Sequence, residues 1–597
     1  MPGSCGEEDK SNAAMPDRTR GLDRNPVMRP QVDDSCAKLK HRGTADFAAR
    51  STIAGPVPAG GRTVMGRVCG SDCSIEKRRR RISTEVELKL AASAGYLPEL
   101  KRALAEMAPA SHSLCRRLIS TYYDTPDLAL KRRGLTLRVR EQGGRFIQTV
   151  KAGDLGGSNI LTRGEWEDEL AANRPDPLAP RSGTRLPDGI AGDLRPLFAT
   201  DVTRTSVAIE PSPATRIEAA IDEGEIRAAD SGGIEPISEI ELELSSGDAA
   251  ALYEVAMRLL EVAPIRIEPR SKSERGYKLR EGAPAAPSVV HAAPVVLDPM
   301  MSVEAALQEI GRACLSHLLR NEPAALGREP EGVHQMRVAV RRLRSAISSF
   351  KKLLPDRDRR SISSELAWLV DVLGSARNLD VFAAELLPPA QAALHETGIE
   401  DLAAALDRAR RTAYDRVGQA IHSERHAAGM LRLSHWFEAR GWRVGQPEPS
   451  PLLSSPIAEL APRLLDRRWR ELRKRSKGFR RLTARQRHKL RVAAKKLRYA
   501  IELLGSLFDQ AELQAFVKRL KRLQDDLGYA NDVHVAHDLL RDLPMQGASR
   551  SAVGRAGAHV IKWHEKRLSR GERKLHKRLR RLNRAAPFWR GQERVGG

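Results

Sequence analysis

The spacing of apolar residues changes once along this chain, and that change limits the folds it can adopt. From Ser83 to about Leu279, short segments alternate apolar and polar residues between Gly, Pro and Asp, which is typical of β-strands. From about Ser302 to Asn583 the spacing is helical, with few glycines. We therefore predict an α+β fold class in which an antiparallel strand domain precedes an all-α domain.

Composition places the boundaries between these parts. Residues 1–81 are rich in Gly, Pro, Ser and charged residues without periodicity, so we expect a disordered leader. We place the strand domain at 82–281 and a linker rich in Pro and Ala at 282–300. The helical domain then covers 301–585, and residues 586–597 form a tail.

The net charge points to an anionic partner. It amounts to +25, from 101 Lys and Arg against 76 Asp and Glu. Residues 1–300 sum to zero, so residues 301–597 carry the whole excess. Aromatic residues make up only 4% of the chain, which disfavours nucleic-acid surfaces that stack bases on aromatic rings. An anion without bases fits this composition better.

Cysteines and apolar runs indicate the compartment. The six cysteines show no paired spacing, which argues against a zinc site or a disulfide framework. No uncharged apolar run reaches the roughly 18 residues of a membrane span, and the N-terminus lacks the order of a signal peptide. We expect a soluble, cytoplasmic protein without membrane association, and the sequence identifies no protein partner.

Charged residues in the strand domain are sorted by sign. Successive strand residues face opposite sides, so Glu85, Glu87 and Lys89 share one face while apolar residues share the other. Glu239, Glu241 and Glu243 form an acidic row, and Arg138 and Arg140 form a basic pair. A solvated sheet face explains any one strand. The sorted set instead predicts carboxylates that hold Mg²⁺ or Mn²⁺ beside cations that hold a polyphosphate.

The segment Glu85-Val-Glu87-Leu-Lys89 resembles the N-terminal ExExK motif of the CYTH superfamily, the triphosphate tunnel metalloenzymes. Further similar segments follow in the family's order over roughly 200 residues. They are Tyr122-Tyr123-Asp124-Thr125, Leu137-Arg138-Val-Arg140, Thr149-Val-Lys151, Glu165-Trp-Glu167, Arg204, Asp222, Glu239-Ile-Glu241-Leu-Glu243 and Lys272.

The resemblance implies an eight-stranded antiparallel β-barrel with a charged tunnel. By analogy, the divalent metal ligands are Glu85, Glu87, Asp222, Glu241 and Glu243. The same analogy gives a triphosphate site of Lys89, Arg138, Arg140, Lys151, Arg204 and Lys272. It gives catalytic roles to Glu85, Glu87, Lys89 and Lys151.

Members of this superfamily differ in substrate. Inorganic triphosphate, thiamine triphosphate and RNA 5′-triphosphate are hydrolysed, and ATP is cyclised in the adenylate cyclase branch. Fusion to a helical repeat domain is typical of the bacterial inorganic triphosphatases. We therefore predict an enzyme that hydrolyses inorganic triphosphate to pyrophosphate and phosphate, with Mg²⁺ or Mn²⁺ as cofactor.

The helical half contains an internal repeat. His334, Arg337, Arg341 and Arg344 stand at offsets that place them along one stripe of a helix. The second copy repeats those offsets with His488, Arg491, Lys495 and Arg498. We predict a duplicated helical bundle with repeats at about 301–445 and 455–585. A solvated face accounts for one such stripe, but its duplication favours an anion-binding surface.

A second segment follows in each repeat, ending at Asp380 and at Asp532. These carboxylates either orient the basic stripe of their own repeat by ion pairing or belong to an acidic helix terminus. His534 and His537 are candidate metal ligands, although surface or capping histidines explain them better.

This half resembles the CHAD domain, a helical domain with two histidine-containing repeats that commonly follows CYTH in bacterial chains. The resemblance implies that both basic stripes bind inorganic polyphosphate, with metal chelation by the histidines as the second choice. Two other hypotheses remain at this point. One is a non-catalytic protein in which both halves bind polyphosphate, and the other is nucleic-acid binding by the helical half.

Overall fold

A computed structural model describes residues 83–590, except residues 110, 154–159, 231, 283–287, 395–396, 445–449 and 544–548. The predicted leader at 1–81 and residues 591–597 of the predicted tail lie outside the described residues. In the part of the chain that is described, no helix combines the length and apolar character needed to cross a membrane.

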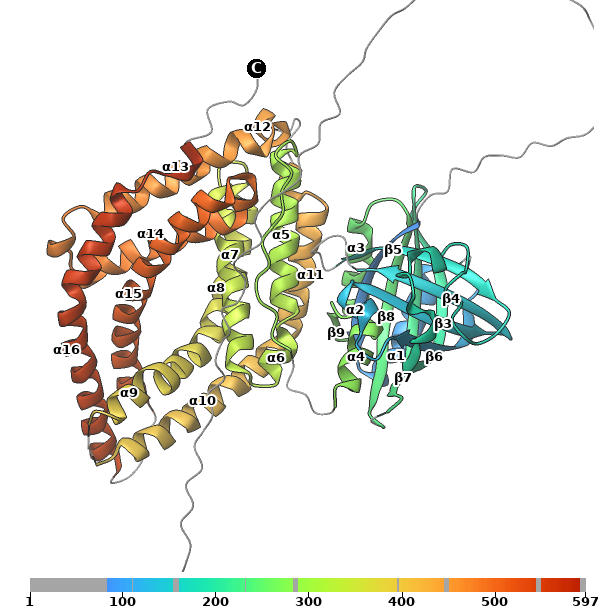
Figure 1. Cartoon of the computed structure of the whole chain (residues 1–597), viewed down its shortest axis with the longest axis horizontal. Helices are drawn as coiled ribbons and strands as arrows, with labels where there is room; N and C mark the ends of the chain where they lie inside the picture. The colour runs from blue at the N-terminus through green and yellow to red at the C-terminus, as the bar shows by residue number, and fades with distance from the viewer. Residues whose placement is uncertain are drawn as a thin grey trace, which may run out of the picture. The chain divides into compact units, whose positions relative to one another are not determined.

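The N-terminal part is built on a curled antiparallel sheet of nine strands (Figure 1). Along the sheet the order is β5-β4-β3-β2-β6-β7-β8-β1-β9. The strands are β1 (Ser83–Ala92), β2 (Leu114–Asp124), β3 (Leu135–Gln142), β4 (Arg145–Ala152), β5 (Ile160–Leu170), β6 (Arg195–Ser212), β7 (Thr215–Ala228), β8 (Ile234–Ser246) and β9 (Ile265–Ile267).

The prediction of a barrel with eight strands is wrong in its strand count. The ninth strand, β9, has only three residues and pairs with the end of β1. The ends of the curled sheet meet only in part, because Ser83–Leu88 of β1 pair with Ile160–Glu165 of β5 while Glu87–Ala91 pair with β8. The sheet is therefore not a uniformly closed barrel, although its strands are antiparallel as predicted.

Alternation along the strands separates an apolar outer face from a charged inner one. Leu88 and Leu90 of β1 are fully buried among apolar side chains, while Glu87 and Lys89 point to the opposite face. Helices α1 and α3 pack on the outer side and α4 packs against β6 and β7. Among the described residues of this part, the α-helices are α1 (Leu97–Met107), α2 (Ala129–Arg132), α3 (Ala250–Leu260) and α4 (Lys272–Arg280).

The C-terminal part is helical (Figure 1). Its α-helices are α5 (Val303–Leu319), α6 (Glu322–Leu326), α7 (Pro330–Ser349), α8 (Asp356–Val381), α9 (Leu387–Gln391), α10 (Ile399–Ile421), α11 (Glu424–Glu438), α12 (Pro451–Ser454), α13 (Ile457–Ser476), α14 (Ala484–Leu504), α15 (Gln510–Asp542) and α16 (Ser549–Arg584). A π-helical turn, η4 (Phe382–Leu386), extends α8.

The predicted duplication is confirmed in the packing of these helices. In the first repeat α7 packs against α5 and α8, and in the second α14 packs against α13 and α15. The two copies also contact each other, because α7 packs against α14 and α8 against α15. This arrangement brings the helices that carry the two basic stripes side by side.

The described part of the predicted linker is attached to the helical bundle. The Val290 backbone N–H donates to the Asn321 side chain at 3.0 Å, and Arg342 donates to the Ala293 carbonyl at 3.0 Å. Val295 and Leu297 are buried in the apolar core. Residues 288–300 therefore form an extended strap along the helices.

Candidate functional site

The inner face of the curled sheet encloses a polar cavity of about 290 Å³. Every residue that the sequence predicted for the tunnel lines this cavity, although the individual roles stay predictions. These residues are Glu85, Glu87, Lys89, Arg138, Arg140, Lys151, Arg204, Asp222, Glu241, Glu243 and Lys272. They come from β1, β3, β4, β6, β7, β8 and the first turn of α4.

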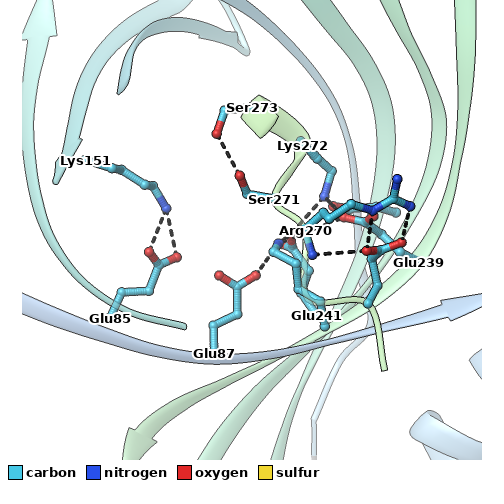
Figure 2. A network of polar contacts seen from close by, with 12 residues as sticks. Glu85, Glu87, Lys151, Glu239, Glu241, Arg270, Ser271, Lys272 and Ser273 are labelled. Atoms are coloured by element: carbon cyan, nitrogen blue, oxygen red, sulfur yellow. Dashed lines mark hydrogen bonds and ion pairs between the residues drawn. The ribbon is translucent and has the colours of Figure 1, made fainter. Parts of the chain in front are cut away.

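One group of carboxylates in the cavity is already neutralised by cations. Lys272 donates to Asp222 at 2.6 Å and to Glu241 at 2.8 Å, and it also contacts Glu239 (Figure 2). Arg204 donates to both oxygens of Asp222, at 2.7 and 2.6 Å. Burial would raise the pKa of Glu241, but the cations, with Lys272 first, hold this pKa well below its ordinary value.

Glu239 lies in this group as well, although the sequence did not predict it as a metal ligand. Asp222, Glu239 and Glu241 each offer an oxygen within 4.8 Å of the others, which is a spacing that suits a metal ion. Arg275 also donates to Glu239, at 2.9 Å. A metal would have to displace these cations before it could bind here.

A second group of carboxylates has an excess of negative charge. Glu87 on β1 stands directly across from Glu243 on β8, and Glu85 lies two residues before Glu87 on the same face. Lys151 donates to both oxygens of Glu85 at 2.8 Å (Figure 2). Lys89 contacts Glu87, so three carboxylates face two lysines. Burial and the charges of Glu85 and Glu87 raise the pKa of Glu243 to about 7. Hard oxygen ligands that repel one another in this way suit a divalent cation such as Mg²⁺ or Mn²⁺.

Guanidinium groups of β3 form another wall of the cavity. Burial, together with the charges of Arg138 and Arg204, lowers the pKa of Arg140 to about 10. Arg140 donates weakly to the Ser120 hydroxyl at 3.4 Å, and Arg138 lies 3.6 Å from a Glu165 oxygen. Cations that are crowded in this way favour a bound polyanion, which would relieve their mutual repulsion.

Several lining residues were not assigned a role from the sequence. Glu218 on β7 alternates with the buried Ile217 and Ala219, so the same period-two rule could have identified it. Ser120 shares the buried face of β2 with Leu118 and Tyr122, so alternation of apolar and polar residues does not mark it. Ser271 and Ser273 line the cavity beside Lys272. No strand pattern marks these two residues, because they belong to the N-terminus of α4.

A second cavity, of about 870 Å³, lies among the helices where the repeats meet. It brings together seven of the eight residues predicted for the basic stripes: His334, Arg337, Arg341, His488, Arg491, Lys495 and Arg498. The eighth, Arg344, is exposed and does not line the cavity. The cavity thus does not extend to Arg344, which lies about one helical turn beyond Arg341.

Cations in this cavity outnumber the carboxylates that face them. Burial is the main reason that the pKa of His334 falls to about 4 and that of Arg337 to about 9, with neighbouring arginines adding to both shifts. Burial and the charges of Arg341 and Arg491 lower the pKa of Lys495 to about 6. The cavity is thus preorganised for an anion that supplies the missing negative charge.

The second segments of the repeats differ from the prediction. Asp532 lies 3.9 Å from Arg491 of its own repeat, as predicted. Asp380 instead accepts hydrogen bonds from Arg410 at 3.0 Å and Tyr414 at 2.9 Å, so the prediction of an ion pair with its basic stripe is wrong. In the first repeat Asn378 takes the place that Asp532 has in the second. Asn378 follows Gly374 by four residues, as Asp532 follows Gly528.

Other lining residues were missed, among them Arg377, Tyr499, Tyr529, His564 and Arg567. Arg377 lies in the second segment of the first repeat, three residues before Asp380, and no sequence pattern assigned it a role. His534 and His537, the alternative metal ligands, are exposed and do not line this cavity. In the described part of the chain, the side chains spaced to hold a metal are Asp222, Glu239 and Glu241, so neither histidine belongs to that group.

Two family models match the chain in separate segments. The CYTH domain matches residues 83–277, and the CHAD domain matches residues 309–541. The first match spans the curled sheet, and the second spans most of both helical repeats.

Individual proteins are similar to one part of the chain or the other. An inorganic triphosphatase of Haemophilus influenzae is 34% identical over 199 residues, which are 33% of this chain and 54% of the relative. The chain thus spans about half the length of that relative. The crystal structure of the CHAD domain from the plant Ricinus communis is 28% identical, with a TM-score of 0.45, and covers 50% of this chain and 98% of that one. A Hippeastrum protein described as an adenylyl cyclase candidate with a dominant triphosphatase activity is 16% identical, with a TM-score of 0.25, and covers 32% of this chain and 95% of that one.

Proposed function

Because this chain contains a CYTH domain followed by a CHAD domain, we propose that it hydrolyses inorganic triphosphate to pyrophosphate and phosphate with a divalent metal, and that its helical part binds inorganic polyphosphate. Triphosphate hydrolysis is supported by the lining of one cavity, which combines an acidic group with a guanidinium wall. Glu85, Glu87 and Glu243 form the acidic group, and Arg138 and Arg140 belong to the guanidinium wall.

The residues of the cavity support separate roles in this reaction. Glu85, Glu87 and Glu243 would hold Mg²⁺ or Mn²⁺, which when bound supplies neutralisation of phosphate charge and orientation of water. Asp222 and Glu241 belong to the predicted ligand set too, but their ion pairs with Lys272 and Arg204 would have to open first.

Basic side chains of the cavity bind and orient the substrate. Arg138, Arg140 and Arg204 offer planar forks that match phosphate oxygens, and Lys89 and Lys151 act as point charges. In the hydrolysis itself the water oxygen bonds to a terminal phosphorus, the bridging P–O bond breaks and pyrophosphate leaves with the electron pair. The protein's share is positioning and charge neutralisation, because this transfer needs little covalent help.

A phosphate-release panel tests the enzymatic half of the proposal. Purified full-length protein with Mg²⁺ or Mn²⁺ is given triphosphate, ATP, thiamine triphosphate or long-chain polyphosphate. We expect triphosphate to be the best substrate. Glu87→Gln should reduce its turnover at least about a hundredfold, since it removes one charge from the acidic group. The control is Glu210→Gln, an exposed residue of β6, which should keep full activity.

Other outcomes of this panel favour the competing hypotheses. Conversion of ATP to cyclic AMP with triphosphate left intact would favour the adenylate cyclase branch. Preference for thiamine triphosphate or another nucleotide would keep the fold and change the substrate. Tight phosphate binding without turnover, unaffected by Glu87→Gln, would favour a non-catalytic polyphosphate-binding protein.

The binding half rests on the second cavity, where the basic residues of both repeats converge and outnumber the carboxylates. We expect linear polyphosphate to bind more tightly than duplex DNA at equal phosphate concentration. The double variant Arg337→Gln with Arg491→Gln should weaken polyphosphate binding, whereas Arg344→Gln, outside the cavity, should not. A preference for DNA would overturn this half of the proposal.

A further inference from the structure

Arg341 and Lys495 occupy equivalent positions in the two repeats, each seven residues after the histidine of its own stripe. Both line the basic cavity and both are half-buried. Within the described residues, neither side chain makes a hydrogen bond or an ion pair. A half-buried cation without a counterion is unfavourable, so this pair is the point at which the cavity most lacks negative charge.

The charged groups that face Lys495 come from three helices. Arg337 and Arg341 approach from α7, and Arg491 precedes Lys495 on α14 itself. Asp532 of α15 is the carboxylate with the largest effect on Lys495, and it lies 3.9 Å from Arg491. Lys495 thus shares this negative charge with another cation.

The remaining charged groups of the cavity are mostly paired with one another. Arg498 donates to Glu502 at 2.6 Å, and Arg377 donates to Glu385 at 3.1 Å. Arg567 lies over the ring of Tyr529, 5.9 Å from its centre. The titratable groups that complete the lining are His334, His488, Tyr499, Asp525 and His564. None of these groups makes a hydrogen bond or ion pair with Lys495 within the described residues.

The two equivalent positions carry different chemistry. A guanidinium stays charged throughout the physiological range, so Arg341 is a permanent cation. Burial and the adjacent arginines lower the pKa of Lys495 to about 6, so in the empty cavity its amine is mostly uncharged above neutral pH. A phosphate chain beside it would reverse that preference, because an adjacent anion stabilises the ammonium form.

We propose that Lys495 couples anion capture by this cavity to the uptake of a proton, and thereby selects for densely charged anions. As the anion enters, the lone pair of the amine binds a proton from the solvent, and the resulting ammonium pairs with phosphate oxygens. The inference rests on the proposed polyphosphate binding and adds its regulation by pH. Binding of a weakly charged anion, such as chloride, releases too little free energy to offset the cost of protonating Lys495.

Calorimetry on the full-length protein tests this coupling. Linear polyphosphate is titrated at about pH 8 into wild-type protein and Lys495→Arg, in two buffers with different heats of ionisation. We expect wild type to take up close to one proton more than Lys495→Arg does. Wild-type affinity should fall by up to about tenfold per pH unit above neutrality, and Lys495→Arg should bind up to about a hundredfold more tightly at pH 8.

Two further variants separate this effect from protonation elsewhere. Arg344→Lys introduces a lysine outside the cavity and should match wild type in proton uptake. Arg341→Lys places a second titratable amine at the equivalent position and should increase the uptake, which gives a test even if Lys495→Arg does not fold. Protonation of the polyphosphate ends is common to all variants, so it cancels in the comparison.

Failure of the inference and failure of the proposed function give different results. If no variant binds polyphosphate, the proposed function of the helical part is wrong. If all bind it with the same proton uptake and the same pH dependence, polyphosphate binding stands and the role of Lys495 is overturned.

Discussion

At the residue scale, Lys272 holds together the most crowded set of charges in the tunnel cavity. Its ammonium contacts Asp222, Glu239 and Glu241, and the three carboxylates raise its pKa well above the ordinary value against the effect of burial. We predict that Lys272→Met lowers the free energy of unfolding by about 3–5 kcal/mol, because it leaves buried carboxylates without their partner. Urea denaturation measures this change.

A surface ion pair provides the control for Lys272. Lys101 contacts Glu223 at 3.3 Å with both side chains substantially exposed, so Lys101→Met should change stability by less than about 1 kcal/mol. Equal losses for the two variants would show that burial of the Lys272 cluster adds nothing to its contribution.

His317, beneath the strap, makes the stability of the helical part dependent on pH. Its Nε2 lies 3.1 Å from the Val290 carbonyl and 3.2 Å from the Gln335 side-chain oxygen, so it donates as a neutral ring. Burial and the nearby Arg342 lower its pKa to about 4. The unfolded chain therefore binds this proton more readily, and stability present above about pH 6.5 is lost as the pH falls towards 4.

The expected loss from His317 is about 3 kcal/mol over that range. Thermal or urea unfolding at a series of pH values measures it. His317→Gln should flatten this part of the profile, whereas His422→Gln, at an exposed position, should leave it as in wild type. An unchanged slope in His317→Gln would assign the acid sensitivity to other groups.

At the element scale, α4 delivers Lys272 to the cavity through one close contact. A Cβ atom on Gly276 would lie 2.2 Å from the ring of Phe198 on β6, so only glycine lets the helix approach this closely. Phe198 in turn stacks on Tyr122, which lines the cavity, with ring centres 4.6 Å apart. We predict that Gly276→Ala costs about 1–3 kcal/mol and also lowers triphosphate turnover, because α4 must shift.

A glycine without neighbours controls for helix propensity. Nothing lies within 4 Å of a Cβ built on Gly554 of α16, so Gly554→Ala should be neutral or stabilise the protein by up to about 1 kcal/mol. Activity assays and unfolding curves on both variants check the pair. Unchanged turnover in Gly276→Ala would show that the position of α4 is not needed for the reaction.

The same elements show what the sequence could predict and what it could not. Period-two alternation identified the inner face of the sheet, since side-chain direction in a strand follows directly from position. It could not identify β9, whose three residues are too short for a pattern, or the serines at the start of α4. Tertiary packing determines the places of both.

Helical periodicity had a similar limit. It placed Arg337, Arg341 and Arg344 on one stripe, but how far along α7 the cavity extends depends on where α14 packs, and Arg344 lies beyond its lining. Asp380 was matched to Asp532 because both are aspartates near the end of the second segment. Asp380 stands two residues further along its segment than Asp532 does, and two residues turn a side chain about 200° around a helix. The carboxylate therefore faces Arg410 rather than the cavity.

At the scale of the whole molecule, the two cavities balance charge in different ways. Carboxylates and cations in the tunnel pair with one another, and residues 1–300 sum to zero. Residues 301–597 carry the entire net charge of +25, and the stretch 461–500 alone carries +15. Long-range attraction for a polyanion should therefore come from the helical part.

This difference predicts unequal sensitivity to salt. With Mg²⁺ held constant, raising the salt concentration from about 50 to about 200 mM should weaken polyphosphate binding at least about a hundredfold. The reason is that unpaired protein cations displace the counterions condensed on the polyphosphate when the polymer binds. The KM for triphosphate should change only a few-fold, because the acidic group and the guanidinium groups offset each other within one largely buried cavity. Parallel binding and kinetic titrations of the same full-length preparation measure both quantities. Equal salt dependence at the two sites would contradict this prediction, since it would mean that the acidic and basic groups of the tunnel cavity do not offset each other.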